Sequence, residues 1–336
     1  MWRKLKQPPW RTVVPGFVLL VAILVAYFLW SPGLDIRDGR HDRGRNGIWL
    51  QHGWLGADEW FIRNAKTNRI VEFRDPARIR ALADKLRAHH VTDVFPHVSP
   101  ASAQGPLPPV DDAQVARFLD VFDSFRVIPW TGGVNDNHVH LESLRWRSNF
   151  VGSIRSLLDR HPRLAGIQIN VEPLRSGTTN FLDLLDELRG ALPRGKIISI
   201  AAYPPPTRWQ PSPEVHWDEP FFRAVARRCD QLAVMMYDTS LRNRKLYEQL
   251  MSKWTREILD WSEGASVLLG LPTYDDAGVG YHHPSAENLT NSLRGVHHGL
   301  TKRAPLPTNY CGVALYCEWE MDEAEWGYFR SHFIKP

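Results

Sequence analysis

Apolar and polar positions alternate along residues 47–336 in a pattern that switches regularly between the period of a β-strand and that of an α-helix. Strand-like runs are predicted at 48–55, 91–97, 126–130, 164–171, 196–203, 231–237, 266–271 and 312–318. Helical periodicity is predicted at 76–89, 111–125, 141–160, 180–191, 219–228, 244–262, 285–299 and 322–333. Eight strands that are each followed by a helix predict an α/β fold of the (β/α)8 TIM-barrel type over 47–336.

The run 164–171 is the most informative of these strands. Its side chains alternate, so Gln168, Asn170 and Glu172 share one face, and the apolar residues between them share the other. Pro173 follows at once and ends the strand, because proline lacks the N–H that a sheet needs. A polar row that climbs to a carboxylate is typical of the inside of a barrel that opens onto a substrate. On this strand alone, Glu172 could equally end in solvent.

The active site of such a barrel lies at the carboxyl ends of its strands. Polar and aromatic residues gather at these positions in the sequence: Trp54, His97, Trp130, Asn170, Glu172, Tyr203, Tyr237, Asp238, Tyr274, Asp275, Asp276, Tyr316, Glu318 and Trp319. Since nearly every predicted strand ends in this way, a site built from several strands is predicted.

The N-terminal 46 residues have a different composition. Residues 13–30 are almost all apolar, broken only by Pro15 and Gly16, and basic residues precede them. Such a run predicts a single transmembrane helix, with residues 1–30 as a basic cytoplasmic stub and membrane anchor and the barrel periplasmic or extracellular. A cleaved signal peptide is the alternative, but no small-residue cleavage site follows. Residues 31–46, rich in Gly, Asp and Arg, are predicted to form a flexible linker.

Charge, cysteine content and the absence of known motifs limit the partners, disulfides and cofactors that the sequence predicts. The net charge is only +4, and the basic residues of the barrel are interleaved with acids, so no nucleic-acid partner is predicted. The three cysteines are predicted to be buried free thiols. No nucleotide-binding or zinc motif occurs, and we predict neither a cofactor nor a metal. Asp136, His138 and His140 have ligand-like spacing, but without a recognisable further ligand they predict a polar loop.

Several strand ends resemble those of glycoside hydrolase family 18, the chitinase-like barrels. Residues 165–172 read AGIQINVE where that family has D-G-x-D-x-D-x-E, so only Gly166 and Glu172 match. Residues 130–133 (WTGG) are similar to the family's S-x-G-G without its serine, and 235–238 (MMYD) match M-x-Y-D completely. Residues 268–274 (LLGLPTY) resemble the L-G-x-P-x-Y run, and Tyr316 stands where the family usually has a tryptophan.

The resemblance implies hydrolysis assisted by the substrate, with Glu172, Asn170, Tyr237 and Asp238 as catalytic residues. Glu172 would protonate the leaving glycosidic oxygen, while the sugar's own 2-acetamido oxygen attacks the anomeric carbon. Asn170 replaces an aspartate of family 18, and the Asn-x-Glu sequence is similar to that of the family 85 endo-β-N-acetylglucosaminidases. Asn170 can orient the acetamide, but it offers no negative charge to the developing oxazolinium.

These observations predict a membrane-anchored glycoside hydrolase that cleaves an N-acetylhexosamine-containing polysaccharide. Its substrate-binding residues would be the aromatic side chains suited to stack on sugars: Trp54, Trp130, Tyr203, Tyr274, Tyr316 and Trp319. Two alternatives stay open. One is an inactive chitinase-like barrel that binds glycan or a protein partner, which the lost aspartates favour. The other is a retaining glycosidase with two carboxylates, for which Asp275 and Asp276 are candidates.

Overall fold

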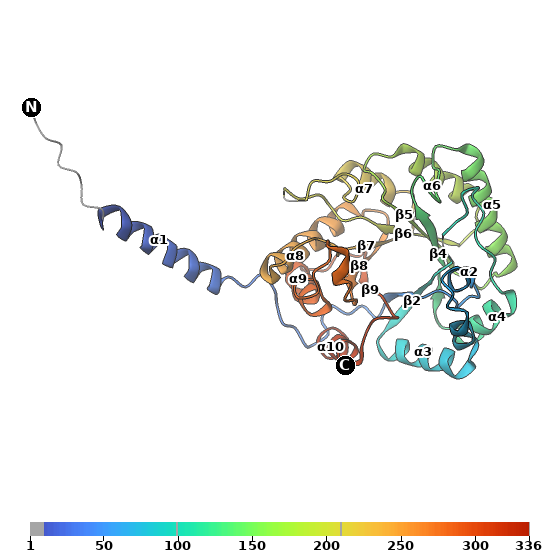
Figure 1. The fold of residues 1–336 in the computed structure, drawn as a ribbon, viewed down its shortest axis with the longest axis horizontal. Coiled ribbons are helices and arrows are strands. Elements are labelled where there is room, and N and C mark those ends of the chain that lie inside the picture. Colours follow the sequence, from blue (N-terminus) through green and yellow to red (C-terminus); the bar gives the residue numbers. More distant parts are fainter. Residues whose placement is uncertain (1–9, 99, 209, 336) are drawn as a thin grey trace, which may run out of the picture.

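The computed structural model describes residues 10–98, 100–208 and 210–335 of the 336-residue chain. The described residues form one parallel sheet of nine strands that curls round on itself, with helices outside it (Figure 1). The strands are β1 (Asn46–Leu50), β2 (Val91–Pro96), β3 (Arg126–Val127), β4 (Trp130–Val134), β5 (Gly166–Glu172), β6 (Ile197–Ala202), β7 (Gln231–Met235), β8 (Ser266–Pro272) and β9 (Tyr310–Tyr316). Their order in the sheet is β3-β2-β1-β9-β8-β7-β6-β5-β4.

β3 and β4 are two parts of one barrel strand. β3 pairs with β2, β4 pairs with β5, and only Ile128 and Pro129 separate them. Pro129 has no N–H to donate, which interrupts the ladder at this point. A parallel bridge between His97 and Trp130 then brings β4 back beside the end of β2. The sheet is therefore a TIM-like α/β barrel with eight strand positions, as the periodicity predicts.

A helix follows each of the eight strand positions: α3 (Pro76–Ala88), α4 (Asp112–Val121), α5 (Leu144–Arg160), α6 (Thr179–Ala191), α7 (Glu219–Ala226), α8 (Arg244–Trp261), α9 (Leu289–Lys302) and α10 (Glu323–His332). In α3 the Asp75 side chain caps the first turn, and Ile79, Leu82 and Leu86 are buried against the sheet. Two short elements, α2 (Glu59–Arg63) and η1 (Thr67–Arg74), lie between β1 and α3. A third, η2 (Ala277–Val279), follows β8.

A chain of polar side chains crosses the interior of the barrel. Trp49 donates to Gln168 (2.7 Å), Gln168 to Ser199 (3.1 Å), and Ser199 to Gln231 (2.8 Å). Gln231 then donates to Asp93 (2.5 Å), which also accepts two hydrogen bonds from the guanidinium of Arg126. Gln168 therefore faces inward, and Asn170 and Glu172 continue the same face toward the mouth.

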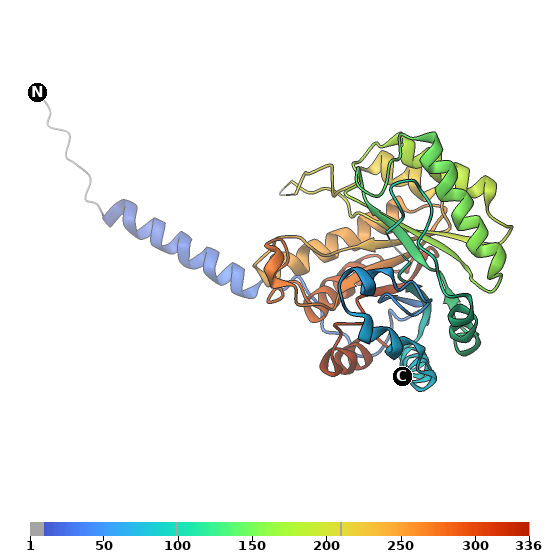
Figure 2. The ribbon, with the colours of Figure 1, turned by 45° about the vertical axis from the view of Figure 1, so that its right-hand side comes forward.

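The helix α1 (Trp10–Leu29) extends away from the barrel (Figures 1 and 2). In the part of the chain that the structure describes, no helix combines the length and the apolar character needed to cross a membrane. Residues 17–29, the uninterrupted apolar part of α1, rise only about 20 Å at about 1.5 Å per residue, against about 30 Å for a hydrocarbon core. The predictions of a transmembrane helix, a membrane anchor and a membrane location are therefore wrong.

The segment 31–46 contacts the barrel along its length. The Leu34 N–H donates to the carbonyl of Arg294 (2.9 Å), and the buried Asp42 lies 2.5 Å from His90 Nδ1. The flexible linker and the domain boundaries stay predictions. All three cysteines are buried free thiols, which confirms that prediction.

Candidate active site

Glu172 and Asn170 form a hydrogen-bonded pair at the carboxyl end of β5. The Asn170 Nδ2 donates to Glu172 Oε1 over 2.6 Å. The other end of the same amide, Oδ1, is buried and accepts no hydrogen bond within the described part of the chain. One end of the Asn170 amide is thus committed to the carboxyl group, and the other remains an acceptor for a ligand.

The neighbouring strand β4 carries a glycine directly beside this pair. Gly132 lies opposite Asn170 in the register of β4 and β5. A Cβ at Gly132 would lie 1.8 Å from the Asn170 carbonyl oxygen, and its φ of +136° lies in the region that favours glycine. The glycine in the family-like segment 130–133 therefore has a structural reason here, because a side chain at this backbone conformation would run into the backbone of β5 at Asn170.

The surroundings of Glu172 favour its protonated form. Desolvation by burial raises the pKa of Glu172, the hydrogen bond from Asn170 opposes this, and the negative charge of Asp238 raises the pKa further. The side chain is nevertheless accessible at the mouth of the barrel. Both observations fit a concave site, in which protein surrounds a group that a ligand can still reach. A carboxyl group held in this way suits a general acid.

Tyr237 and Asp238 follow β7 and face the same mouth. Asp238 has φ +59°, and its carboxylate accepts a hydrogen bond from the hydroxyl of Tyr274. The Tyr237 ring stacks on Tyr316, with centroids 5.3 Å apart and planes at 16°. Burial raises the pKa of Tyr237, so its hydroxyl keeps the proton and can act as a donor. The structure thus brings together the four residues predicted to be catalytic.

Behind Asp238 lies a buried pair that the sequence analysis missed. His282 Nδ1 lies 3.2 Å from Asp238 Oδ1 and 3.9 Å from Glu287 Oε2, and its Nε2 lies 3.2 Å from the Tyr274 carbonyl. A carbonyl can only accept, so Nε2 donates, and Nδ1 can donate to a carboxylate only when the ring is charged. Burial lowers the pKa of His282, but the Asp238 hydrogen bond and the charge of Glu287 outweigh it, and the net shift is upward. The His282 ring therefore lies between the carboxyl groups of Asp238 and Glu287, where it can orient Asp238.

The predicted substrate-binding aromatics do not all face one space. Trp130, Tyr316 and Trp319 line a cavity of about 350 Å³ at the ends of β1, β2, β4 and β9. Farther round the rim, Tyr203 is buried and Tyr274 is half-buried, and Tyr274 stacks on His282 with centroids 4.2 Å apart. Trp54 is buried and packs edge-on against Phe73. The substrate roles of these residues stay predictions.

Much of the cavity wall comes from residues that the sequence analysis did not select. The described residues that line the cavity are Gln51, His52, Trp60, Lys66, Arg69, His97, Trp130, Tyr316 and Trp319. Trp60 belongs to α2 and Arg69 to η1, in the connection between β1 and α3. This stretch has neither a family motif nor a strong period, so the sequence alone offered no signal for it.

The histidines of the 136–140 loop make local contacts. His138 Nδ1 accepts from the N–H of Val134 at 3.3 Å, and His140 lies 3.8 Å from Glu142. Within the described ranges, no group of three His, Cys, Asp or Glu side chains is arranged to hold a metal ion.

Comparison with solved structures identifies the fold. The Bacillus cereus spore cortex-lytic enzyme SleL matches with a TM-score of 0.57 and 12% identity, over 87% of this chain and 76% of that chain. A chitinase from Bacteroides thetaiotaomicron matches with a TM-score of 0.55 and 12% identity, over 86% of this chain and 97% of that chain. The chain has a chitinase-like barrel fold of the glycoside hydrolase family 18 type.

Another match to this chitinase-like barrel is a fungal endo-β-N-acetylglucosaminidase from glycosyl hydrolase family 18, with a TM-score of 0.51 and 14% identity, over 73% of this chain and 88% of that chain. No protein-family profile matches the sequence, and no curated protein does. The matches to solved structures thus confirm the resemblance to family 18 at the level of the fold.

Proposed function

We propose that the chain is a glycoside hydrolase that cleaves a polysaccharide containing N-acetylhexosamine, with Glu172 as general acid and base. The observation that carries the proposal is the Asn170–Glu172 pair, with one amide end on the acid and the other free. Proteins of the same fold include chitinases and an endo-β-N-acetylglucosaminidase, which supports an acetamido sugar as substrate.

In the first step, the proton of Glu172 moves to the glycosidic oxygen as the bond from that oxygen to the anomeric carbon breaks. The carbonyl oxygen of the sugar's acetamide forms a bond to the same carbon, which gives an oxazolinium-like intermediate. Asn170 Oδ1 accepts a hydrogen bond from the acetamide N–H, and the Tyr237 hydroxyl donates to the acetamide oxygen. Both contacts hold the acetamide oxygen, the nucleophile, in position to attack the anomeric carbon, and such positioning of a reacting group accelerates the reaction.

In the second step, the carboxylate of Glu172 takes a proton from water as the water oxygen attacks the anomeric carbon. The bond to the acetamide oxygen breaks, and the configuration is retained. Asp238 supplies negative charge near the developing cation, and the buried His282 holds Asp238 in place. Asn170 adds no charge, so Asp238 is the main anion that faces the intermediate.

A glycan-binding barrel without catalysis is the second candidate, and the asparagine at 170 is the observation that favours it. A retaining mechanism with a carboxylate nucleophile has less support, because Asp275 and Asp276 are both exposed beyond β8.

The test is the release of reducing ends from matched oligomers with and without the acetamide. The panel contains chitin oligomers, glucosamine polymers without N-acetyl groups, and peptidoglycan glycan strands. The proposal predicts cleavage of acetylated substrates and none of the de-N-acetylated polymer, because the latter lacks the nucleophile. Equal cleavage of both would contradict substrate assistance and favour a two-carboxylate mechanism. Binding of glycans without any release would favour the second candidate.

A further inference from the structure

The cavity beside Trp130 and Tyr316 has the size and the aromatic walls of a sugar-binding site. Its volume of about 350 Å³ lies in the range of small-ligand sites, roughly 300–1,000 Å³. Trp130 and Trp319 provide flat apolar faces of the kind on which pyranose rings stack, whereas the Trp60 ring is itself stacked on His52, with centroids 5.0 Å apart. The Trp130 Nε1 is buried without a hydrogen-bond partner among the described residues. It is therefore a donor that a bound ligand would satisfy.

Two basic side chains line the same cavity. Lys66 Nζ lies 5.0 Å from the ring centroid of Trp60, and within the described residues no carboxylate lies within 4.0 Å of it. Arg69 Nη2 donates to the side chain of Gln51 at 3.2 Å, and its Nε is 3.9 Å from Glu72, at the limit of an ion pair. None of the described residues that line the cavity is acidic. Neither side chain is therefore neutralised by a close carboxylate of a described residue, and both can form an ion pair with a ligand.

The other titratable groups of the wall do not cancel this charge. His52 and His97 face each other through their Nδ1 atoms at 2.5 Å, and burial lowers the pKa of His52 to about 3. Burial lowers the pKa of His97 as well, so both rings are neutral. Glu318 follows β9 nearby, and burial raises the pKa of its carboxyl group. Lys66 and Arg69 are therefore the charged side chains in the described lining of the cavity.

The cavity adjoins the proposed catalytic residues. Tyr316 lines it and stacks on Tyr237 at 5.3 Å, and Tyr237 directly precedes Asp238. A sugar that occupies the cavity would therefore belong to a chain that runs on toward Glu172.

We propose that this cavity is a glycan subsite for a sugar that carries a carboxylate, bound through Lys66 and Arg69 while its ring stacks on tryptophan. The inference rests on the proposed function and narrows its substrate to an acidic acetamido glycan. Lysine provides a point charge and arginine a planar pair of donors, and both suit a carboxylate. The carboxylate could belong to a lactyl ether, as in peptidoglycan, or to a uronic acid.

The test measures binding, so that it does not depend on turnover. Glu172→Gln protein is titrated calorimetrically with four tetrasaccharides: chitotetraose, the alternating N-acetylglucosamine–N-acetylmuramic acid tetramer, its methyl ester, and a hyaluronan tetramer. We expect the free acid to bind about tenfold more tightly than its ester, because an ionic hydrogen bond is lost on esterification. The advantage should shrink as salt rises. The relative affinities of the two acidic tetramers identify the source of the carboxylate.

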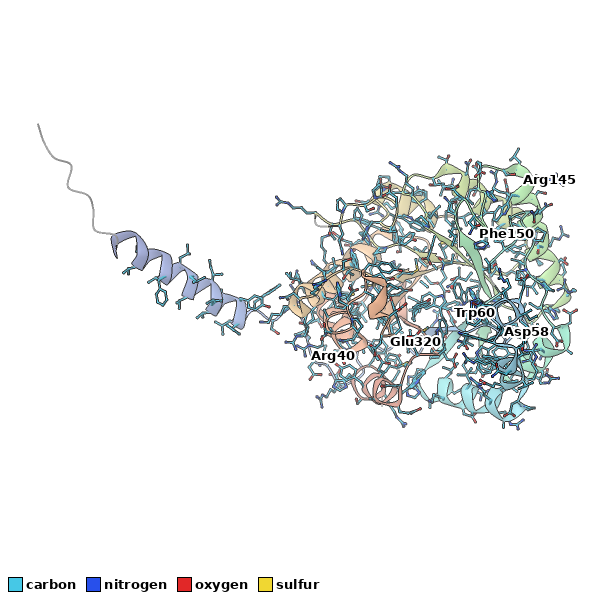
Figure 3. All side chains as sticks on the ribbon, viewed as in Figure 1. Arg40, Asp58, Trp60, Arg145, Phe150 and Glu320 are labelled. Atoms are coloured by element: carbon cyan, nitrogen blue, oxygen red, sulfur yellow. The ribbon has the colours of Figure 1, made fainter. Side chains whose placement is uncertain are left out.

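Variants locate the effect in the cavity. Lys66→Met and Arg69→Met, each in the Glu172→Gln background, should abolish the preference for the free acid and leave the affinity for chitotetraose within about twofold. Arg145→Met is the matched control, since Arg145 is exposed on α5, apart from Trp60 (Figure 3). It should keep the preference.

Equal binding of acid and ester, or a preference that survives in both variants, would overturn the inference. A hydrolysis assay with the parent protein distinguishes a failure of the acidic subsite from a failure of the proposed glycosidase activity. Cleavage of chitotetraose without any preference for acid would leave the glycosidase standing without the subsite. A preference for acid without cleavage of any substrate would leave the subsite standing without the glycosidase.

Discussion

Replacing Asn170 by alanine removes a single hydrogen bond to the proposed general acid. The bond from Asn170 Nδ2 to Glu172 Oε1 is 2.6 Å long and stabilises the carboxylate more than the protonated acid. Its loss should therefore raise the pKa of Glu172 further. A hydrogen bond to a charged group contributes about 1.5–3 kcal/mol, and one pKa unit corresponds to about 1.4 kcal/mol. Because Glu172 is accessible at the mouth, water replaces part of the bond, and we expect a shift of about one unit.

The assay is the pH dependence of kcat/KM for reducing-end release from a chitin oligomer. Glu172 acts as an acid in its protonated form, so activity is present below its pKa and falls as pH rises through it. In Asn170→Ala this falling limb should move to higher pH by about one unit, while the maximum rate drops because the acetamide loses its acceptor. Asn180→Ala, on α6, is the matched control and should leave the limb in place. A limb that stays in place in Asn170→Ala, or moves to lower pH, would refute the reasoning.

Three further predictions concern charge in the barrel. Arg126→Met leaves the fully buried Asp93 without its cation and should lower the free energy of unfolding by about 3 kcal/mol in urea titrations. The control Arg155→Met, at an exposed position, should change the free energy of unfolding little. Equal effects of the two substitutions would contradict the role of the buried pair. Burial raises the pKa of Glu287 above its unfolded value, so the folded state binds more protons and stability should fall as pH rises from about 4.5 through the raised pKa. Glu287→Gln should flatten this decline in thermal melts at pH 5 and 8, and an unchanged decline would exclude Glu287 as its source. Asn170→Asp adds a negative charge beside the proposed oxazolinium and should increase kcat, and a total loss of activity would count against an electrostatic role.

The parts of the site that lie on strands could be predicted from the sequence. Alternation placed Asn170 and Glu172 on the inner face of β5, and the parallel barrel brings the end of β7, with Tyr237 and Asp238, to the same rim. Period 2 fixes which face a strand residue occupies, and the fold fixes which ends meet. These two rules suffice for residues within one or two positions of a strand end.

Contacts made by loops could not be predicted in the same way. His282 contacts Asp238 across more than forty residues of sequence and also contacts Glu287, and these contacts depend on how the segment after β8 folds. Lys66 and Arg69 reach the cavity only because α2 and η1 pack beside β1. No periodic pattern specifies such contacts, since the polar character of a loop residue does not tell which partner it meets.

Two predictions were wrong about the length of an element, one for the first strand and one for the N-terminal helix. The strand predicted over 48–55 ends at Leu50 in β1, so Trp54 lies beyond it and packs in the core against Phe73. The N-terminal apolar run forms a helix, but hydropathy alone overstated the apolar length that the helix presents. In both cases the pattern of residue types predicts the kind of element but not its extent along the chain.

The measurement that tests the central claim most directly is reducing-end release by Glu172→Gln beside the parent protein. The substitution keeps the shape of the side chain and removes the transferable proton, so release from the best acetylated substrate should fall by at least about a hundredfold. Glu320→Gln, the same change at an exposed position after β9, should leave the rate unchanged, and thermal melts of both variants should match the parent. Activity of Glu172→Gln close to that of the parent would contradict the account, because no other group in it can protonate the leaving oxygen.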